Sequence, residues 1–371
     1  MKKIIAVLLC IMLLLNTGIV MAAQTSSVQE DKAAKIIIDG VPLKLSNVAI
    51  IKDKKLMLST EVFTGLGVAK TGQVWDKSKT KLTLTKGKTK LVMQINSSTA
   101  TLNGTKKTVS VKPFLYKSKA YFPVDFVADC FGRNINKDSQ TNTYFLRDKS
   151  SFSKNKLLLD NVLKSMNSVS KLKVKENAEL SLKGTGLDIK LTAPVSTLMD
   201  LKSKKAFSTI NYKMNTNGEV TENNILIAMN DNKQYSQVDQ GEWTHEDMSE
   251  KEFTDGFAFN SLVKYDNTIL SALTSVNGKD KNEVILKGNV IIGSTLSDFL
   301  TSQELIKNQI SSKYVELTIN TSTNCISKII LKESGTTDIE GTKYNFSVTY
   351  QMNFSDINGN FEVEMPSDLN S

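Results

Sequence analysis

Few residue types in this chain could carry out a reaction, and histidine is the scarcest of them. His245 is the single histidine among 371 residues, and its polar, acidic surroundings predict an exposed turn. An imidazole-based metal centre needs several histidines, and a serine or cysteine nucleophile usually needs one as its base. The sequence also lacks a nucleophile elbow. We therefore predict no enzyme activity, no catalytic or metal-ligating residue and no cofactor.

Two further patterns in the sequence could bind an ion or a phosphate, and both are weak. The acidic run after His245 lacks the Asp, Asn and Gly spacing of a calcium loop, so it predicts a solvated face. Gly184-Thr185-Gly186 lacks a third glycine and a following helix, so it predicts no phosphate loop. A pair of carboxylates from distant strands remains an alternative, because such a hydrolase site leaves no local motif. The acidic run consists of Glu246, Asp247, Glu250, Glu252 and Asp255.

The first 23 residues have the pattern of an export signal. Lys2 and Lys3 precede an apolar run over residues 4–15, and small residues suitable for cleavage follow near Ala22. Cys10 is not preceded by the small residue that a lipidation signal needs, so no lipid anchor is expected. No later segment reaches about 18 consecutive apolar residues. We expect an exported protein, extracellular or associated with the cell envelope, with no membrane span after cleavage.

Two cysteines remain after cleavage, Cys130 and Cys325. They fall in different halves of the chain and no CxxC spacing is present. We expect two unpaired, buried thiols without a redox role.

The net charge of +9 conceals two different halves. Residues 24–150 hold 22 Lys and Arg against 10 Asp and Glu, whereas residues 151–371 hold 23 against 28. A polar linker near Ser150 separates them, so we predict domains at 24–150 and 151–371. The basic half suits an anionic cell-wall polymer or membrane headgroups, and nucleic acid is not expected outside the cell. The alternative is that the lysines serve solubility alone.

The basic half contains a pattern that occurs twice, about 64 residues apart. Asp39-Gly40 recurs as Asn103-Gly104, residues 52–54 recur as 117–119, and residues 62–67 recur as 127–132. Asp-Gly and Asn-Gly favour two-residue hairpin turns, here between strands 35–38 and 41–45 and between strands 99–102 and 105–111. Helices are predicted at 61–66, capped by Ser59 or Thr60, and at 126–131. They end at Gly67 and Gly132, and strands 81–85 and 142–147 follow.

The order of "IDG", "KLMLSTEVFTGLG", "VWDKSKTKLTLTKG", "LNG", "AYFPVDFVADCFG" and "NTYFLRD" resembles the copper amine oxidase N-terminal-like domain, or stalk domain, of exported bacterial proteins. The resemblance covers residues 35–148. The "VPL" of that family survives before the second helix as Phe122-Pro123-Val124, while the first copy has Met57-Leu58-Ser59. The family name implies no copper chemistry for this chain, because one histidine cannot build a type-2 copper site.

The second half is predicted to be a helix followed by a β-meander. Apolar residues keep helical spacing over 154–169. Strands are expected at 172–182, 187–192, 197–214, 224–229, 233–238, 283–292, 313–320, 326–332 and 342–354, with helices at 261–274 and 296–310. These helices are expected to cover the apolar face of the sheet.

The last predicted strand alternates more regularly than any other. Its large apolar residues alternate with polar ones, which places them on one face of a sheet. They are candidates for lining a ligand cavity, and a fully packed core is the alternative. These residues are Tyr344, Phe346, Val348, Tyr350, Met352 and Phe354.

Three segments, "LLLDNVLKSMNSVSKLKVKENAEL", "QYSQVDQGEW" and "YNFSVTYQMNFSDINGNFEVEMPSDL", resemble the lipoprotein-carrier family of LolA, LppX and LprG. The closing pattern of an apolar strand, "INGN", a short strand and Pro366 is the most specific part. The resemblance implies a curved antiparallel sheet, or half-barrel, with helices over its concave face. It also implies binding of a lipid or acylated ligand without covalent chemistry.

These observations define an expected fold and two functions. We expect an α+β chain in which two repeated hairpin-helix-strand units precede the half-barrel. The first function is a non-catalytic envelope protein that binds a hydrophobic ligand in its second domain and contacts the envelope through its basic domain. The alternative is a structural or interaction protein of the cell wall with a filled core. Nothing in the sequence predicts the oligomeric state.

Overall fold

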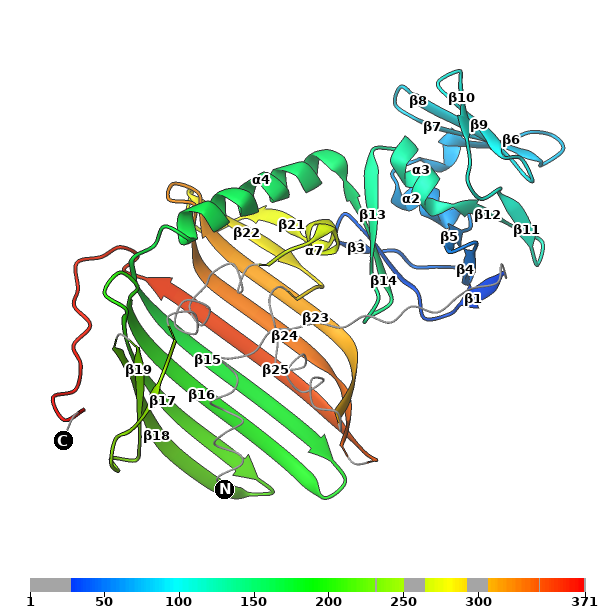
Figure 1. Ribbon diagram of the computed structural model, residues 1–371. Coiled ribbons are helices and arrows are strands. Elements are labelled where there is room, and N and C mark those ends of the chain that lie inside the picture. Colours follow the sequence, from blue (N-terminus) through cyan, green and yellow to red (C-terminus); the bar gives the residue numbers. More distant parts are fainter. Residues whose placement is uncertain (1–27, 231, 250–263, 292–305, 340, 370–371) are drawn as a thin grey trace. The chain divides into compact units, whose positions relative to one another are not determined.

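The computed structural model describes residues 28–230, 232–249, 264–291, 306–339 and 341–369 (Figure 1). The described chain forms two compact units. The N-terminal unit holds residues up to Lys154 and also Leu270–Ala272, while the C-terminal unit holds Asn155–Ile269 and the chain from Leu273 onward. The expected export signal at 1–23 and Cys10 lie outside the described residues.

The N-terminal unit is built from three sheets. The first is antiparallel, with strands in the order β1-β4-β5-β12-β11. The second has the order β10-β9-β8-β7-β6, and the third the order β13-β14-β2-β3. The strands of the first sheet are β1 (Gln29–Asp31), β4 (Ala49–Lys52), β5 (Lys55–Leu58), β11 (Phe114–Tyr116) and β12 (Lys119–Pro123). Those of the second are β6 (Gln73–Trp75), β7 (Lys81–Lys86), β8 (Thr89–Gln94), β9 (Thr99–Leu102) and β10 (Thr105–Thr108). Those of the third are β2 (Lys35–Ile38), β3 (Val41–Pro42), β13 (Arg133–Asp138) and β14 (Thr143–Asp148).

Two short helices lie between these strands. α2 (Glu61–Gly65) is followed by the 3-10 turn η2 (Lys70–Gly72), and α3 (Val124–Cys130) follows β12. Gly67 and Gly132 come after the helices with φ of 82° and 72°, which is the left-handed geometry that glycine adopts without strain. Apolar side chains of both helices are buried in one core, including Phe63 and Val127.

The starts of both helices differ from expectation. Thr60 is the N-cap of α2, but its side chain makes no capping hydrogen bond. Instead the hydroxyl of Ser59 donates to the carboxylate of Glu61. α3 begins at Val124, two residues earlier than expected, directly after Pro123. Pro123 is the N-cap of α3, and a proline is tolerated there because an N–H at this position would have no partner within the helix.

The two copies of the sequence pattern pair differently within the unit. β14, which closes the second copy, pairs directly and in parallel with β2. β7, which closes the first copy, pairs instead with β6 and β8, and β8 then pairs with β9. An additional strand, β8, therefore lies between the strand that closes the first copy and the strand that opens the second, and the equivalence of the two copies as repeated units stays a prediction.

The C-terminal unit is dominated by one antiparallel sheet of 11 strands, whose long strands curve into a half-barrel (Figure 1). Its order is β20-β19-β18-β17-β16-β15-β25-β24-β23-β22-β21. The strands are β15 (Lys171–Gly184), β16 (Leu187–Asp200), β17 (Lys205–Thr216), β18 (Glu219–Asn230), β19 (Lys233–Val238), β20 (Thr244–Asp247), β21 (Thr274–Asn277), β22 (Glu283–Gly288), β23 (Ile306–Asn320), β24 (Cys325–Ile339) and β25 (Thr342–Ser355).

Several predicted strand limits were wrong. β16 runs without a break through Pro194, where two strands separated by a gap at residues 193–196 were expected, and the turn comes later, at residues 201–204. β20 and β21 were not predicted. The short strand expected after "INGN" does not form, because residues 361–366 have no regular structure. The side chain of Asn358 in that motif instead accepts hydrogen bonds from the N–H and hydroxyl of Ser170.

The described chain is mostly β, where an α+β chain was expected. α4 (Lys149–Met166) matches the first predicted helix and begins five residues earlier. α7 covers only Asn267–Ala272, and its N-cap Asp266 accepts the N–H of Ile269 at 2.9 Å. Ile306–Ile310, expected at the end of a helix, begins β23. Residues 296–305 of that predicted helix lie outside the described residues.

Within the described ranges, no helix is both long and apolar enough to span a membrane. α4 has 18 residues, but its buried side chains form one face only: Asn155, Leu159, Val162 and Met166.

Candidate functional site

The six candidate lining residues lie at alternate positions of β25, so they share one face of the large sheet. Directly paired residues of neighbouring antiparallel strands point to the same side. Phe346 pairs with Leu182 of β15 and Val348 with Leu180, while Met352 pairs with Ile329 of β24. We call this side the apolar face. It is the side on which Leu180, Leu182 and Ile329 also lie.

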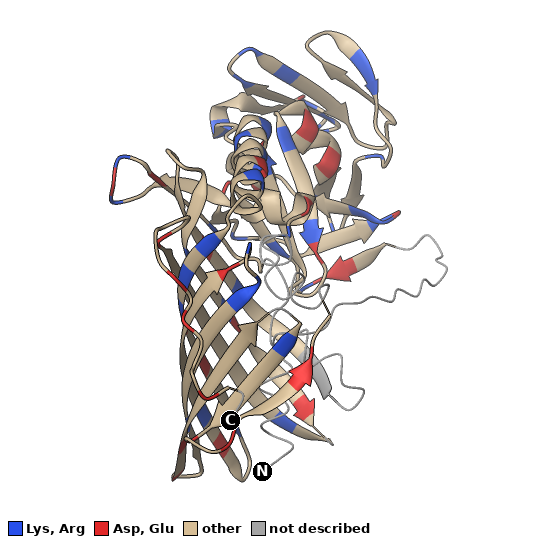
Figure 2. Cartoon of the chain, turned by 60° about the vertical axis from the view of Figure 1, so that its left-hand side comes forward, with Lys and Arg blue, Asp and Glu red and all other residues tan. Residues whose placement is uncertain are grey.

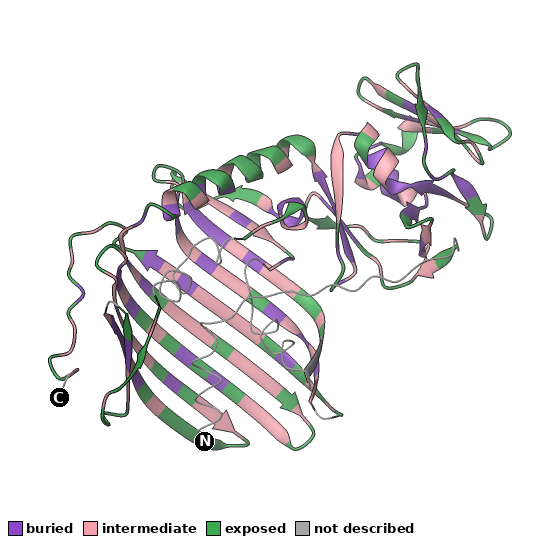
Figure 3. Ribbon diagram, in the orientation of Figure 1, coloured by how far each residue is buried: buried purple, intermediate pink, exposed green. Residues whose placement is uncertain are grey.

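Burial varies along the apolar face (Figure 3). Phe346, Met352 and Phe354 are buried, whereas Tyr344, Val348 and Tyr350 are half-buried. Leu180, Leu182 and Leu331 around the middle of β25 are also half-buried. The structure thus places the six residues together, and the lining of an open cavity by them stays a prediction.

A carboxylic acid and a phenol lie within this apolar face. Glu176 is on β15 and Tyr350 on β25, and the Tyr350 hydroxyl donates to Glu176 Oε2. The residues that pair directly with Glu176 are Val195 of β16 and Met352 of β25. Burial raises the pKa of Glu176, and the Tyr350 hydrogen bond opposes that change. Burial and the nearby Glu176 carboxylate raise the pKa of Tyr350 well above its usual range.

Sequence reasoning did not identify Glu176. The sequence does contain a signal for this residue, because Glu176 is a charged residue within a series of apolar residues at alternate positions: Leu172, Val174, Ala178 and Leu180. A second such interruption occurs on the same face, where Thr197 of β16 and Ser208 of β17 are buried and their hydroxyls lie 3.0 Å apart. Buried polar groups of this kind are normally hydrogen-bonded, as these are.

The opposite face of the sheet is polar and contains a pocket of ≈ 340 Å³. At directly paired positions across four adjacent strands, this face carries the polar residues Asn353, Lys175, Ser196 and Thr209. Pro194 also lines this pocket, and the pairing of β16 with β17 is interrupted beside it. Proline has no N–H to donate to a ladder, which accounts for the interruption. The pocket is lined from the polar face by Lys175, Asn177, Pro194, Ser196, Thr209, Asn211 and Asn353, and Glu176 and Val195 of the apolar face also border it.

Residues that could have bound metal are dispersed. His245 is exposed as expected, but it lies on strand β20 and not in a turn, and its ring centroid lies 5.8 Å from that of Tyr235. Glu246 accepts a hydrogen bond from Gln234, while Glu250, Glu252 and Asp255 lie outside the described residues. Across the described ranges, no three His, Cys, Asp or Glu side chains come close enough to hold a metal ion.

Both cysteines of the described chain are free thiols. Cys325 is buried and Cys130 is half-buried, so the expectation of two unpaired thiols is confirmed and that of full burial holds for Cys325 alone. Burial raises the pKa of Cys130 to about 11, with a further contribution from the Asp129 carboxylate. A thiol with so high a pKa is a poor nucleophile at neutral pH, which fits a structural role.

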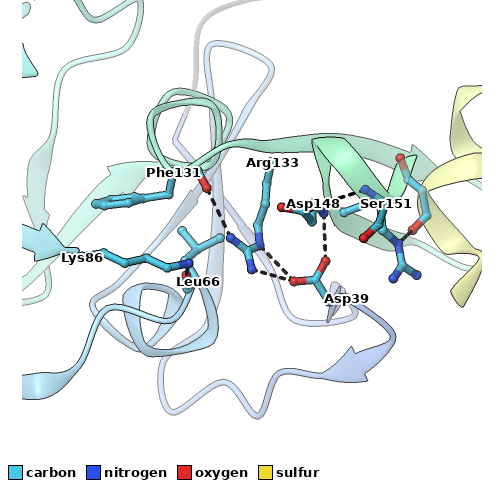
Figure 4. Close-up of polar contacts among 9 residues, drawn as sticks. Asp39, Leu66, Lys86, Phe131, Arg133, Asp148 and Ser151 are labelled. Carbon is cyan, nitrogen blue, oxygen red and sulfur yellow. Dashed lines mark hydrogen bonds and ion pairs between the residues drawn. The ribbon is translucent and has the colours of Figure 1, made fainter. Parts of the chain in front are cut away.

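In the N-terminal unit, charged side chains hold the ends of helices and strands together (Figure 4). Lys86 Nζ donates to the carbonyl of Leu66 at 2.7 Å, just after α2, and Arg133 Nη1 donates to that of Phe131 at 3.3 Å, just after α3. Burial lowers the pKa of Lys86, and the Arg133 guanidinium adds to this effect. These cations satisfy carbonyl groups that a helix end leaves without a partner.

Arg147 of the same unit is almost fully buried on β14. Its Nε donates to the carbonyl of Ser271 at 3.1 Å and its Nη2 to that of Ala272 at 3.3 Å. Burial lowers the pKa of Arg147, although a guanidinium remains charged in practice. Its hydrogen bonds show why a three-residue piece from the second half of the sequence belongs to the N-terminal unit.

The second sheet of the N-terminal unit is strongly basic. Residues 73–108 contain 8 lysines and a single acid, Asp76. Lys81 lies on the exposed side of this sheet, because it alternates with buried residues of β7. Lys90 and Lys106 lie on the same side, because the strand pairing aligns them with residues of this side on the neighbouring strands. The Asp76 carboxylate accepts the backbone N–H of Thr80 and of Lys81, which lowers its pKa. Figure 2 shows the lysines along this sheet.

Residues 37–146 match the family model of the copper amine oxidase N-terminal domain. This confirms the resemblance proposed from the sequence for the first half of the chain. The matching model describes an N-terminal domain and includes no catalytic part. Among curated proteins, none matched this sequence.

The solved structures that are similar to the chain include the following three. LprF from Mycobacterium bovis is 11% identical, with 58% of this chain and 97% of LprF covered and a TM-score of 0.34. A β-barrel-like protein of the DUF1849 domain from Brucella abortus is 9% identical, with 51% and 100% covered and a TM-score of 0.20. A DUF1329 protein from Desulfovibrio piger is 9% identical, with 56% and 94% covered and a TM-score of 0.19. At these TM-scores none of the three defines the ligand of this chain.

Proposed function

We propose that this protein is a non-catalytic, exported protein of the bacterial cell envelope that binds a lipid or acylated ligand on the apolar face of its C-terminal unit. The observation that supports this most directly is the half-burial of apolar side chains in the middle of that face. Val348, Leu180 and Leu331 belong to three adjacent central strands, where a packed core would enclose them. An alkyl chain laid along them would gain about 0.8 kcal/mol per buried CH₂.

Co-purification and uptake test this proposal. Protein purified from a lipid-containing host should carry lipid in native mass spectrometry, and delipidated protein should take up a fluorescent fatty acid. A clean protein mass together with no uptake would favour the alternative, a structural protein of the cell wall with a filled core.

A matched pair of variants locates the ligand on the sheet. Val348→Gln introduces an amide on the apolar face, and Ser347→Gln introduces the same group on the polar face one residue away. Burying an amide without a partner costs about 1–3 kcal/mol, so V348Q should weaken uptake about tenfold and S347Q should not. Equal behaviour of the two variants would place the ligand elsewhere.

For the basic half, we infer that the exposed side of the second sheet binds an anionic cell-wall polymer. Eight lysines against one acid give this sheet a positive potential, and Asp76 is already hydrogen-bonded within its turn. Binding to purified cell walls should weaken as salt is raised, because salt screens exposed charges. Lys81→Gln, Lys90→Gln and Lys106→Gln together should weaken it further. Salt-independent binding, or no effect of the triple variant, would leave solubility as the role of these lysines.

A further inference from the structure

We propose that the ligand of the apolar face carries a hydroxyl group, which hydrogen-bonds to the pair formed by Glu176 and Tyr350. This proposal rests on the proposed function, because it specifies what the hydrophobic ligand must contain. It would make the pair a specificity element in a site that otherwise recognises only apolar surface.

The hydrogen-bonding capacity of the pair leaves positions for a ligand. Tyr350 has one hydroxyl proton, and it is used in the bond to Glu176 Oε2. Among the described residues, Glu176 Oε1 has no hydrogen-bond partner. The carboxylate and the phenol oxygen therefore retain lone pairs that a ligand donor can occupy.

Because Glu176 and Tyr350 have apolar neighbours, a hydrogen bond from the ligand to this pair contributes more to binding. Val174 and Ala178 flank Glu176 on the same face of β15, and Val195 and Met352 pair with it across the sheet. Within the described ranges, Glu176 forms no ion pair with a lysine or arginine. An alkyl chain that covered the pair without offering a hydrogen bond would remove its water and leave a polar group unsatisfied, which is costly.

The choice of a hydroxyl follows from its ability both to donate and to accept. An ionised Glu176 requires a donor, and a protonated Glu176 can offer its own proton to an acceptor. A hydroxyl serves both states, whereas an ether oxygen can only accept. An anionic group would lie beside a carboxylate with no neighbouring cation among the described residues, and an ammonium would lose more hydration on entering an apolar face.

Two probes that share one alkyl chain and differ in whether their oxygen carries a proton or a methyl group test this inference. 1-Hexadecanol and hexadecyl methyl ether should each displace an uncharged fluorescent hydrocarbon from the full-length protein at pH 8. The natural sequence should prefer the alcohol about tenfold or more, in line with hydrogen bonds to charged groups. If neither probe displaces the hydrocarbon, the proposed function fails, whereas equal displacement by both overturns the hydroxyl inference alone.

Variants of Glu176 and Tyr350 test whether these two residues cause the preference for the alcohol over the ether. Replacing Glu176→Leu together with Tyr350→Phe should abolish the preference and leave binding of the ether at least as strong. Glu176→Gln keeps the size of the side chain and should reduce the preference, because an amide binds the hydroxyl as a neutral group. The control Glu179→Leu changes an exposed residue on the polar face of the same strand and should retain the full preference. An undiminished preference in E176Q, or its loss in E179L, would overturn the proposal.

Discussion

Asp39 and Arg133, 94 residues apart, are joined through a single carboxylate oxygen. Arg133 Nη2 and Nε donate to Asp39 Oδ2 at 2.7 and 3.1 Å. The other oxygen, Oδ1, accepts the backbone N–H of Asp148 at 2.8 Å. Asp39 occupies the turn between β2 and β3, so its carboxylate connects the first hairpin of the N-terminal unit to the strands β13 and β14 that end it.

We expect Asp39→Asn to destabilise the N-terminal unit by about 2 kcal/mol, because Arg133 is largely buried and would lose its charged partner. Hydrogen exchange in urea, read on peptides from β2 and β14, measures this. Asp53→Asn is the matched control, since Asp39 and Asp53 both adopt φ of 49° in hairpin turns and asparagine tolerates that geometry. Equal destabilisation by the two substitutions would show that the ion pair contributes nothing specific.

The raised pKa of Glu176 predicts how stability depends on pH. Above the ordinary value of 4.5, the unfolded chain gives up the Glu176 proton more readily than the folded chain, so the folded state loses stability as the pH rises. Tyr350 is a titratable group in contact with Glu176. Glu333 of β24 pairs with Val348 and therefore lies on the same face of the sheet. Between pH 5 and pH 8, E176Q should lose less free energy of unfolding than the natural sequence. Parallel pH curves for the two proteins would contradict the predicted burial of the acid.

Ligand affinity should depend on chain length. If the apolar face takes up an alkyl chain, each added CH₂ should strengthen binding about fourfold, which corresponds to about 0.8 kcal/mol. Displacement titrations with alcohols of ten to sixteen carbons measure the slope. V348Q should lower it and S347Q should leave it unchanged. An affinity that does not change with chain length would exclude burial of the chain.

Cys130 should react slowly with alkylating reagents in the folded protein. With a pKa of about 11, about one thiol in a thousand is ionised at pH 8, and the thiolate is the reactive form. Mass spectrometry after iodoacetamide treatment should show little modification of Cys130 at pH 8, and complete modification after unfolding in urea. Rapid alkylation of the folded protein would show that the thiol is more accessible than its burial indicates.

The turns and helices of the N-terminal unit could be predicted because their signals are local. Asp39-Gly40 and Asn103-Gly104 both adopt the positive φ values that their residue types favour. The order of strands could not be predicted in this way. Nothing in the sequence near Ile37 indicates that β2 pairs with β14, because that parallel pair is formed by residues more than a hundred positions apart.

In the C-terminal unit, alternation predicted the face of β25 and the location of most strands. The prediction of a strand break around Pro194 was wrong, because β16 continues through this residue. Only the pairing of β16 with β17 is interrupted there. Alternation also missed Glu176, because the significance of a carboxylate in an apolar series depends on Tyr350, which is 174 residues away. The register between β15 and β25 brings the two together, and a single sequence does not contain that register.

The parallel pairing of β2 with β14 has a mechanical consequence. Lys35 pairs with Thr143 and Ile38 with Leu146, so both strands run in the same direction, and the chain enters at the start of one and leaves at the end of the other. A tension applied between these two points slides the strands along each other and loads their hydrogen bonds together, in shear. An antiparallel hairpin pulled at its open end would instead unzip one bond at a time. Stretching the chain across this strand pair therefore has to break several hydrogen bonds at once.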